Sequence, residues 1–167
     1  SDLARSTPIG VERARSLQPS DDRETVLRLL EETGQARRAL LAQARPPLSG
    51  TFDIRPHLSR ARQKGHDLSG DELRQVASTF QTCGEARAGL LALQEGDFDR
   101  LRALGERIGE FRGVVSEVRR CIGPAGEVLA TASEALSEIR GRIRGIRERV
   151  KGRLEKLVSI YEREGIF

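Results

Sequence analysis

The sequence predicts an all-α fold, a helical bundle that continues into one long, coiled-coil-like C-terminal helix. Aromatic residues make up only 4% of the 167 residues, and Trp and Met are absent. A core must therefore be built from Leu, Ile, Val and Ala, which suits packed helices better than a β-sandwich. Charged residues make up 32% of the chain, and the abundance of Ala, Leu, Glu and Arg also favours helices.

Helical spacing of apolar residues and helix-start signals divide residues 1–132 into six helices joined by loops. The predicted helices span residues 8–17, 21–44, 53–63, 70–93, 98–108 and 111–122. Ser20 is predicted to cap the second helix and Asp53 the third. Ser69 and Glu72 form an S-x-x-E capping box in front of the fourth.

The chain breaks firmly at Gly123-Pro124-Ala125-Gly126, and residues 127–132 are predicted as a loop or short extended piece. Ser133 then caps a last helix that reaches about residue 163. Its apolar residues follow one another in steps of three and four, the pattern of a coiled-coil seam. These seam residues are Leu136, Ile139, Ile143, Ile146, Val150, Leu154 and Leu157, with Tyr161 beyond. At 100° per residue they occupy an arc about 80° wide.

Positive charge is concentrated on this last helix. The chain has a net charge of +4, whereas residues 140–156 alone carry eight basic and two acidic residues. Arg140, Arg144, Arg147 and Lys151 line one rim of the seam, and Arg142, Arg149, Arg153 and Lys156 line the other. Such side chains either extend over apolar neighbours with their charge in water or neutralise nucleic-acid phosphates. No aromatic residues interleave with them, so base stacking is not indicated.

Three glycines, Gly141, Gly145 and Gly152, fall nearly opposite the seam. They are either simply exposed, at about 1 kcal/mol each relative to Ala, or they allow another backbone to approach closely. The sequence leaves both interpretations open.

Catalytic and metal-binding motifs are missing from the sequence. There is no P-loop, H-E-x-x-H or C-x-x-C pattern. His57 and His66 are interpreted as surface histidines, and Cys83 and Cys121 as buried small side chains rather than nucleophiles. We therefore expect no catalytic, cofactor-binding or metal-binding residue in this chain.

Apolar runs reach only about four residues, too short to span a bilayer, and no signal peptide is evident. A cytoplasmic protein with no membrane partner is expected. The chain contains no Met, starts at Ser1 and ends at Gly165-Ile166-Phe167, which indicates a piece excised from a larger protein.

Several motifs, in order along the chain, resemble the N-terminal region of the bacterial MutS-II family. One segment is similar to the family pattern "DIR-x-x-L-x-x-A-x-x-G … L-x-x-x-E-L", at Asp53-Ile54-Arg55-Pro56, Leu58, Ala61, Gly65, Leu68-Ser69 and Glu72-Leu73. Residues 122–128 (IGPAGEV) resemble "I-D-x-x-G-E-V", residues 133–140 resemble "A-S-x-x-L-x-x-I-R", and residues 6–19 resemble the family start. Gly123 replaces the usual Asp, and Leu129-Ala130 replaces the commoner Arg-Asp.

The resemblance implies a parent with a helical core and lever, a clamp, a MutS-type P-loop ATPase that uses ATP and Mg²⁺, and often a C-terminal Smr-type endonuclease domain. Such proteins are associated with branched-DNA binding, suppression of homologous recombination and DNA repair, and some with splitting stalled ribosomes. Residues 1–132 would form the helical core subdomain. Residues 133–167 would form the lever helix, truncated before the clamp, within one continuous helical domain.

The resemblance thus implies a non-catalytic core and lever without its own cofactor. It would relay conformational change between the clamp and the ATPase of the same chain. Its nucleic-acid-binding candidates are the eight basic residues of 140–156, and branched or double-stranded DNA or ribosomal RNA would be the partner. The alternative is a protein-interaction or dimerisation module that uses the seam and the glycine row, as a homodimer or docked to a partner or ribosome.

Overall fold

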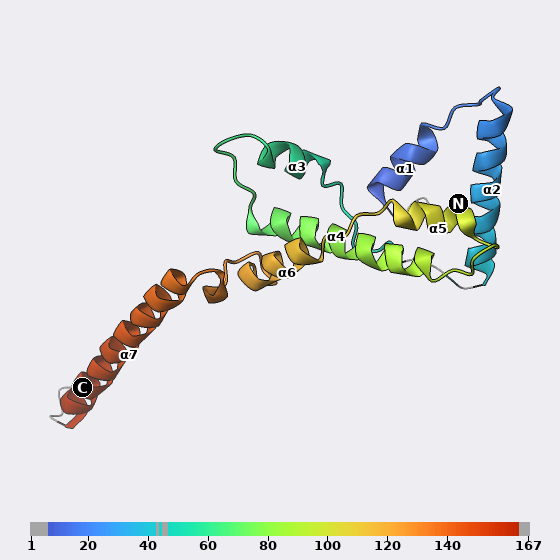
Figure 1. Cartoon of the computed structure of the whole chain (residues 1–167). Coiled ribbons are helices and arrows are strands. Elements are labelled where there is room, and N and C mark those ends of the chain that lie inside the picture. The colour runs from blue at the N-terminus through green and yellow to red at the C-terminus, as the bar shows by residue number, and fades with distance from the viewer. Residues whose placement is uncertain (1–6, 43, 45–46, 164–167) are drawn as a thin grey trace.

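The computed structural model describes residues 7–42, 44 and 47–163, and these contain seven α-helices (Figure 1). They are α1 (Pro8–Arg15), α2 (Arg23–Leu41), α3 (Arg55–Ala61), α4 (Gly70–Leu91), α5 (Asp99–Glu106), α6 (Arg112–Cys121) and α7 (Glu134–Arg163), with a 3₁₀ turn η2 (Ala130–Ala132) before α7. The all-α prediction is confirmed, and each predicted helix has ends within three residues of the observed ones. Residue 6 of the predicted family start and residues 164–167 of the predicted lever lie outside the described residues.

Helix α4 is the centre of the bundle, because α5 and α6 both pack on it and α2 packs on α5 (Figure 1). The buried apolar residues come from these elements and the segment before α3: Ala39, Ile54, Val76, Ala77, Ala86 and Leu101. Several are alanines, so the backbones approach closely but little apolar area is buried per residue. The bundle therefore depends strongly on hydrogen bonds between its elements.

One such hydrogen-bonding group is Gln35 of α2, whose side chain is only 3% exposed. Its Oε1 accepts hydrogen bonds from the backbone amides of Arg100 (3.0 Å) and Leu101 (3.2 Å). These amides lie at the start of α5, where no preceding carbonyl is available to them. The N-cap residue, Phe98, provides no side-chain acceptor. Gln35 therefore caps α5 from another helix.

Replacing Gln35 with Ala is expected to lower the free energy of unfolding by about 1–3 kcal/mol, because the buried amide of Leu101 and the partly buried amide of Arg100 lose their acceptor. Urea unfolding followed by circular dichroism measures this loss. Arg37→Ala, at an exposed position of the same helix, is the control and should change stability by less than about 0.5 kcal/mol. Equal urea midpoints for the two variants would contradict the capping role.

Hydrogen bonds of two threonine hydroxyl groups of α4 hold the loop before α3 against that helix. Thr82 Oγ1 donates to the carbonyl oxygen of Ser49 (3.1 Å), and Thr79 Oγ1 accepts from the amide of Phe52 (3.0 Å). Both threonines are buried, so these bonds are shielded from water. The loop thereby positions the segment that leads into α3.

The capping box at the start of α4 is confirmed. Ser69 Oγ accepts from the amide of Glu72 (3.3 Å), and Glu72 Oε2 accepts from the amide of Ser69 (2.8 Å). The backbone hydrogen bond from Ser69 is the main cause that lowers the pKa of Glu72 to about 2. The predicted cap at Ser20 is wrong: α2 begins later, and Asp22 Oδ2 accepts from the amide of Thr25 (3.0 Å). A carboxylate two residues closer to the helix satisfies that amide better.

The predicted cap position at Asp53 is one residue early, because the N-cap residue of α3 is the buried Ile54. Asp53 Oδ1 nevertheless accepts from the amide of Arg55 (3.2 Å), and Asp53 Oδ2 binds the guanidinium of Arg55 (2.7 Å). Arg55 Nη1 also donates to Glu12 Oε1 of α1 (3.2 Å). The guanidinium lowers the pKa of Asp53 to about 2. The Asp-Ile-Arg motif therefore joins α1 to the segment before α3.

A tight turn connects α6 to α7. Ile122 and Val128 form an isolated antiparallel bridge, and the amide of Gly123 donates to the carbonyl of Glu127 (2.8 Å). Gly126 has a φ of +77° at the end of this turn, a conformation that favours glycine. The predicted break is confirmed. Of residues 127–132, which were predicted as a loop or short extended piece, Val128 pairs with Ile122, whereas residues 130–132 form the 3₁₀ turn η2.

Candidate nucleic-acid interface

Helix α7 leaves the bundle and projects away from it (Figure 1). Among the described elements it packs appreciably only against η2. Ser133 Oγ accepts from the amide of Leu136 (3.2 Å), as the predicted cap requires. Leu136 is half-buried at this base, and beyond it α7 has no helical neighbour among the elements that the structure describes.

The seam is consequently exposed along α7. Ile143 is 44% exposed, Val150 52% and Leu154 57%. Ile139, Ile146 and Leu157 are exposed to a similar degree. The described part of the chain therefore presents a continuous apolar strip that no element of its own covers.

The eight predicted basic residues are all exposed and all lie on α7. The structure thus brings the whole candidate set together, in one line on each side of the seam. From Arg140 to Lys156 the lines extend about 24 Å at 1.5 Å per residue. Among the side chains that the structure describes, only Lys151 of this set has an acidic partner, Glu155 at 3.8 Å.

The acidic residues of α7 are on its other side. Glu134, Glu138, Glu148 and Glu155 fall about 120–180° around the helix from the centre of the seam. The seam side of α7 between residues 140 and 156 is therefore uniformly positive at its edges. Such an arrangement attracts an anionic partner and makes that attraction sensitive to salt.

The glycines opposite the seam face open space. A methyl group added at Gly141, Gly145 or Gly152 would meet no atom within 4 Å. Within the described residues no other backbone approaches these glycines; Gly141 is exposed, and Gly145 and Gly152 are half-buried.

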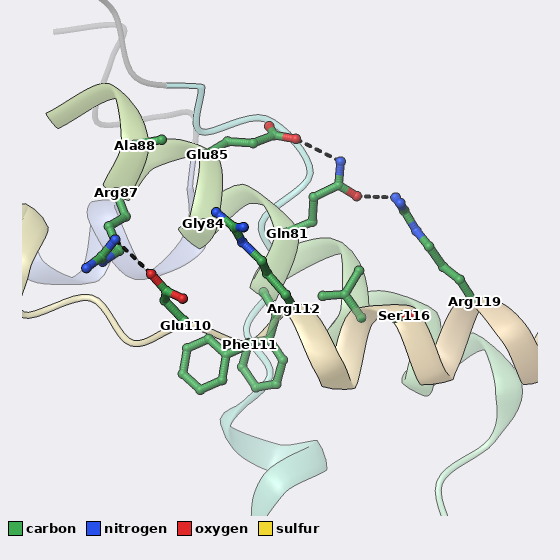
Figure 2. A pocket seen from close by; sticks show the side chains of 12 residues that line it. Gln81, Gly84, Glu85, Arg87, Ala88, Glu110, Phe111, Arg112, Ser116 and Arg119 are labelled. Carbon is green, nitrogen blue, oxygen red and sulfur yellow. Dashed lines mark hydrogen bonds and ion pairs between the residues drawn. The ribbon is translucent and has the colours of Figure 1, made fainter. Parts of the chain in front are cut away.

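A hollow between α4 and α6, with a volume of about 560 Å³, was not predicted (Figure 2). Phe80 of α4 and Phe111 before α6 stack at its floor, with ring centroids 4.2 Å apart. No spacing rule links two rings 31 positions apart, so the sequence alone does not predict this stack.

The polar groups around this hollow are largely paired with one another. Arg87 Nη1 lies 3.0 Å from Glu110 Oε1, and Gln81 Nε2 donates to Glu85 Oε1 (2.7 Å). Arg119 of α6 donates to Gln81 (Figure 2). The Arg119–Gln81 contact joins α6 to α4, and the Arg87–Glu110 contact joins α4 to the segment before α6. Arg87 Nε is buried and has no hydrogen-bond partner in the structure.

The remaining predicted positions show no catalytic arrangement. His57 is half-buried rather than on the surface, because Nε2 lies 3.0 Å from Gln75 Oε1 and Nδ1 lies 3.5 Å from Glu72 Oε1. Cys83 and Cys121 are half-buried rather than buried. Burial raises the pKa of the Cys83 thiol, which disfavours the reactive thiolate.

The described residues also contain no group of three or more His, Cys, Asp or Glu side chains that could hold a metal ion. Within the same part of the chain, no helix combines the length and the apolar character required to cross a membrane.

Comparison with known proteins finds endonucleases MutS2 of several bacteria. No family model and no solved structure matches the chain. It is 37% identical over 126 residues to endonuclease MutS2 of Geobacillus kaustophilus, a match that covers 74% of this chain and 16% of that protein. It is 34% identical over 124 residues to endonuclease MutS2 of Thermomicrobium roseum and 35% identical over 123 residues to that of Symbiobacterium thermophilum.

The match spans about one sixth of the length of these curated relatives. It agrees with the family that the motifs of the chain resemble. This chain is therefore homologous to a segment of the MutS2 endonucleases.

Proposed function

We propose that this chain is the non-catalytic helical core and lever of a MutS2-like DNA-binding ATPase and endonuclease. In such a parent it relays conformational change between the clamp and the ATPase, which binds ATP and Mg²⁺ outside the residues described. The parent acts in the cytoplasm on branched DNA and suppresses homologous recombination, or acts on stalled ribosomes. The homology to endonuclease MutS2 supports this assignment.

The observation that carries the proposal is the form of α7. A single helix of 30 residues leaves the bundle at one end and extends about 45 Å. Its base is fastened to α6, because Thr131 Oγ1 donates to the carbonyl of Arg120 and the Arg120 guanidinium donates back to the carbonyl of Thr131. A change in the orientation of the bundle would therefore be carried to the far end of the helix.

The basic lines on α7 give this lever a contact with nucleic acid. Guanidinium groups are suited to phosphate oxygens because they donate hydrogen bonds in a planar fork. Seven of the eight basic candidates are arginine or lysine side chains with no acidic partner among the described side chains, so they are available for such contacts. Binding of this kind reads the phosphate backbone and not the bases.

The decisive experiment is binding of the 167-residue chain to a fluorescent four-way DNA junction across a salt series. We expect affinity to fall with salt, and the triple variant Arg142→Gln, Arg149→Gln, Arg153→Gln to bind more weakly. Its salt slope should be smaller by about three, roughly one for each phosphate contact removed. A linear duplex of the same length separates preference for a branch from general phosphate binding.

The matched control is the triple variant Arg23→Gln, Arg37→Gln, Arg62→Gln. These arginines are exposed on the bundle, so the net charge changes equally while α7 stays intact. The control should bind the junction with the same affinity and the same salt dependence as the unmodified 167-residue chain. Absence of binding at about 50 mM salt, where phosphate contacts are strong, would remove the arginines as DNA contacts and leave a purely mechanical lever.

The exposed seam favours a second candidate function, a protein-interaction module. Apolar side chains that are about half exposed along a whole helix are typical of an interface. Nucleic-acid binding does not account for this strip, since phosphates contact the charged lines and not the apolar residues between them.

A further inference from the structure

The seam side of α7 combines two features that together specify its partner. The first is the apolar strip, with Ile139 52% exposed at one end and Leu157 49% exposed at the other. The strip is about 27 Å long at 1.5 Å per residue. A helix of about five turns has the length and the shape to cover it, because side chains spaced by three and four residues interlock with those of another helix.

The second feature is the charge of the residues on the two flanks of the seam. In a two-helix coiled coil, the residues beside each seam face the residues beside the seam of the partner, and opposite charges there select the partner. Both flanks of α7 from residue 140 to residue 156 are basic, and Glu148 and Glu155 lie behind them. A second copy of α7, parallel or antiparallel, would therefore place basic flanks against basic flanks.

We propose that the seam side of α7 docks an amphipathic helix that has an apolar seam and Asp or Glu residues on both flanks. The partner's acidic residues pair with the two basic lines while its seam covers the exposed isoleucines and leucines. Docking of such a helix extends the second candidate function above and does not require that α7 bind nucleic acid.

The spacing of the seam adds a constraint on this partner. Between Ile143 and Leu154 the apolar steps are three, four and four, whereas before and after this stretch steps of three and four alternate. The one additional step of four departs locally from the 3.5-residue period that produces a left-handed supercoil. A partner that matches it has the same additional step of four in its centre and packs nearly straight against α7 at this point.

Docking also makes nucleic acid and the acidic helix alternative occupants of α7. Acidic side chains that pair with the two basic lines occupy the guanidinium groups that would contact phosphate. A bound helix is therefore expected to displace DNA from the chain, and DNA to displace the helix.

The test uses the 167-residue chain and two fluorescent peptides of about 25 residues as probes. Both have leucines at the spacing of the seam, one in forward and one in reversed order, with Glu at both flanks. We expect at least one to bind roughly tenfold or more tightly than its Lys-flanked counterpart and than a Glu-flanked counterpart with Ser in the seam. The proposal would be overturned if the Glu-flanked leucine peptides bound no more tightly than their Lys-flanked counterparts, because the flanking charge would then be irrelevant. It would also be overturned if they bound no more tightly than the peptides with Ser in the seam, because the apolar seam would then be irrelevant.

Variants of the chain separate this docking from nucleic-acid binding. Ile146→Gln with Val150→Gln should weaken peptide binding by about tenfold or more and leave binding to the DNA junction unchanged. Leu27→Gln with Leu30→Gln, two exposed positions on α2, is the control and should bind the peptide normally. Sedimentation of the free chain should show a monomer, and a dimer that the Ile146 and Val150 changes abolish would overturn the proposal in favour of a second copy.

Discussion

Gly70→Ala is expected to lower the free energy of unfolding by about 1–3 kcal/mol, the usual cost of forcing an extra carbon into a packed site. A Cβ at this position would lie 1.9 Å from the carbonyl oxygen of Gly126 and 2.7 Å from its carbonyl carbon. Both are backbone atoms, so no rotation of a side chain relieves the overlap. The turn of residues 123–128 would have to move away from the start of α4.

Gly84→Ala is the matched control for this prediction. Gly84 lies on the same helix, and a Cβ there would meet no atom within 4 Å. Alanine is therefore expected to leave stability unchanged or to raise it by up to about 1 kcal/mol. Urea unfolding of the two variants and of the unmodified chain measures the difference in the free energy of unfolding. If Gly70→Ala were as stable as Gly84→Ala, the close approach of α4 to the turn would be refuted.

The displaced turn has a consequence for α7, because the turn and η2 connect the bundle to α7. Gly126 has a φ of +77°, and a Cβ there would also lie 2.7 Å from Asp71 Oδ1. The two glycines thus allow the backbone of the turn to lie directly on the first residues of α4. A shift at this contact would redirect α7.

The triple variant Gly141→Ala, Gly145→Ala, Gly152→Ala is expected to stabilise α7 by about 3 kcal/mol in total, since each glycine within a helix costs about 1 kcal/mol relative to alanine. None of the added methyl groups would meet an atom within 4 Å. Slower hydrogen exchange of the α7 amides and a stronger helical circular dichroism signal would show the effect. In the unmodified chain, amide hydrogen exchange within α7 should be fastest near Gly141 and Gly145.

Gly65→Ala separates this effect from a general benefit of alanine. A Cβ at Gly65 also has open space around it, but its φ is +82°, a conformation that costs alanine energy. This control is therefore expected to destabilise the chain. Uniform hydrogen-exchange protection along α7 in the unmodified chain would show that the glycines do not make α7 more mobile. The same would follow if the triple variant exchanged at the rate of the unmodified chain.

The sequence by itself determined the helices, because their signals are local. A capping box needs only Ser69 and Glu72, and the seam of α7 needs only a spacing of three and four along one segment. The eight basic residues of α7 were recognised for the same reason, since a single helix fixes their relative positions. The resemblance to the MutS-II family was also carried by short motifs in order along the chain.

Only the tertiary structure decided which groups meet across the chain. Gln35 caps α5 from 65 residues away, Phe80 stacks on Phe111, and Gly70 touches the turn at Gly126. Each contact depends on how whole helices pack, which no local pattern specifies. The exposure of the seam was decided in the same way: periodicity shows which face of a helix is apolar, but only the positions of the other helices show whether anything covers it.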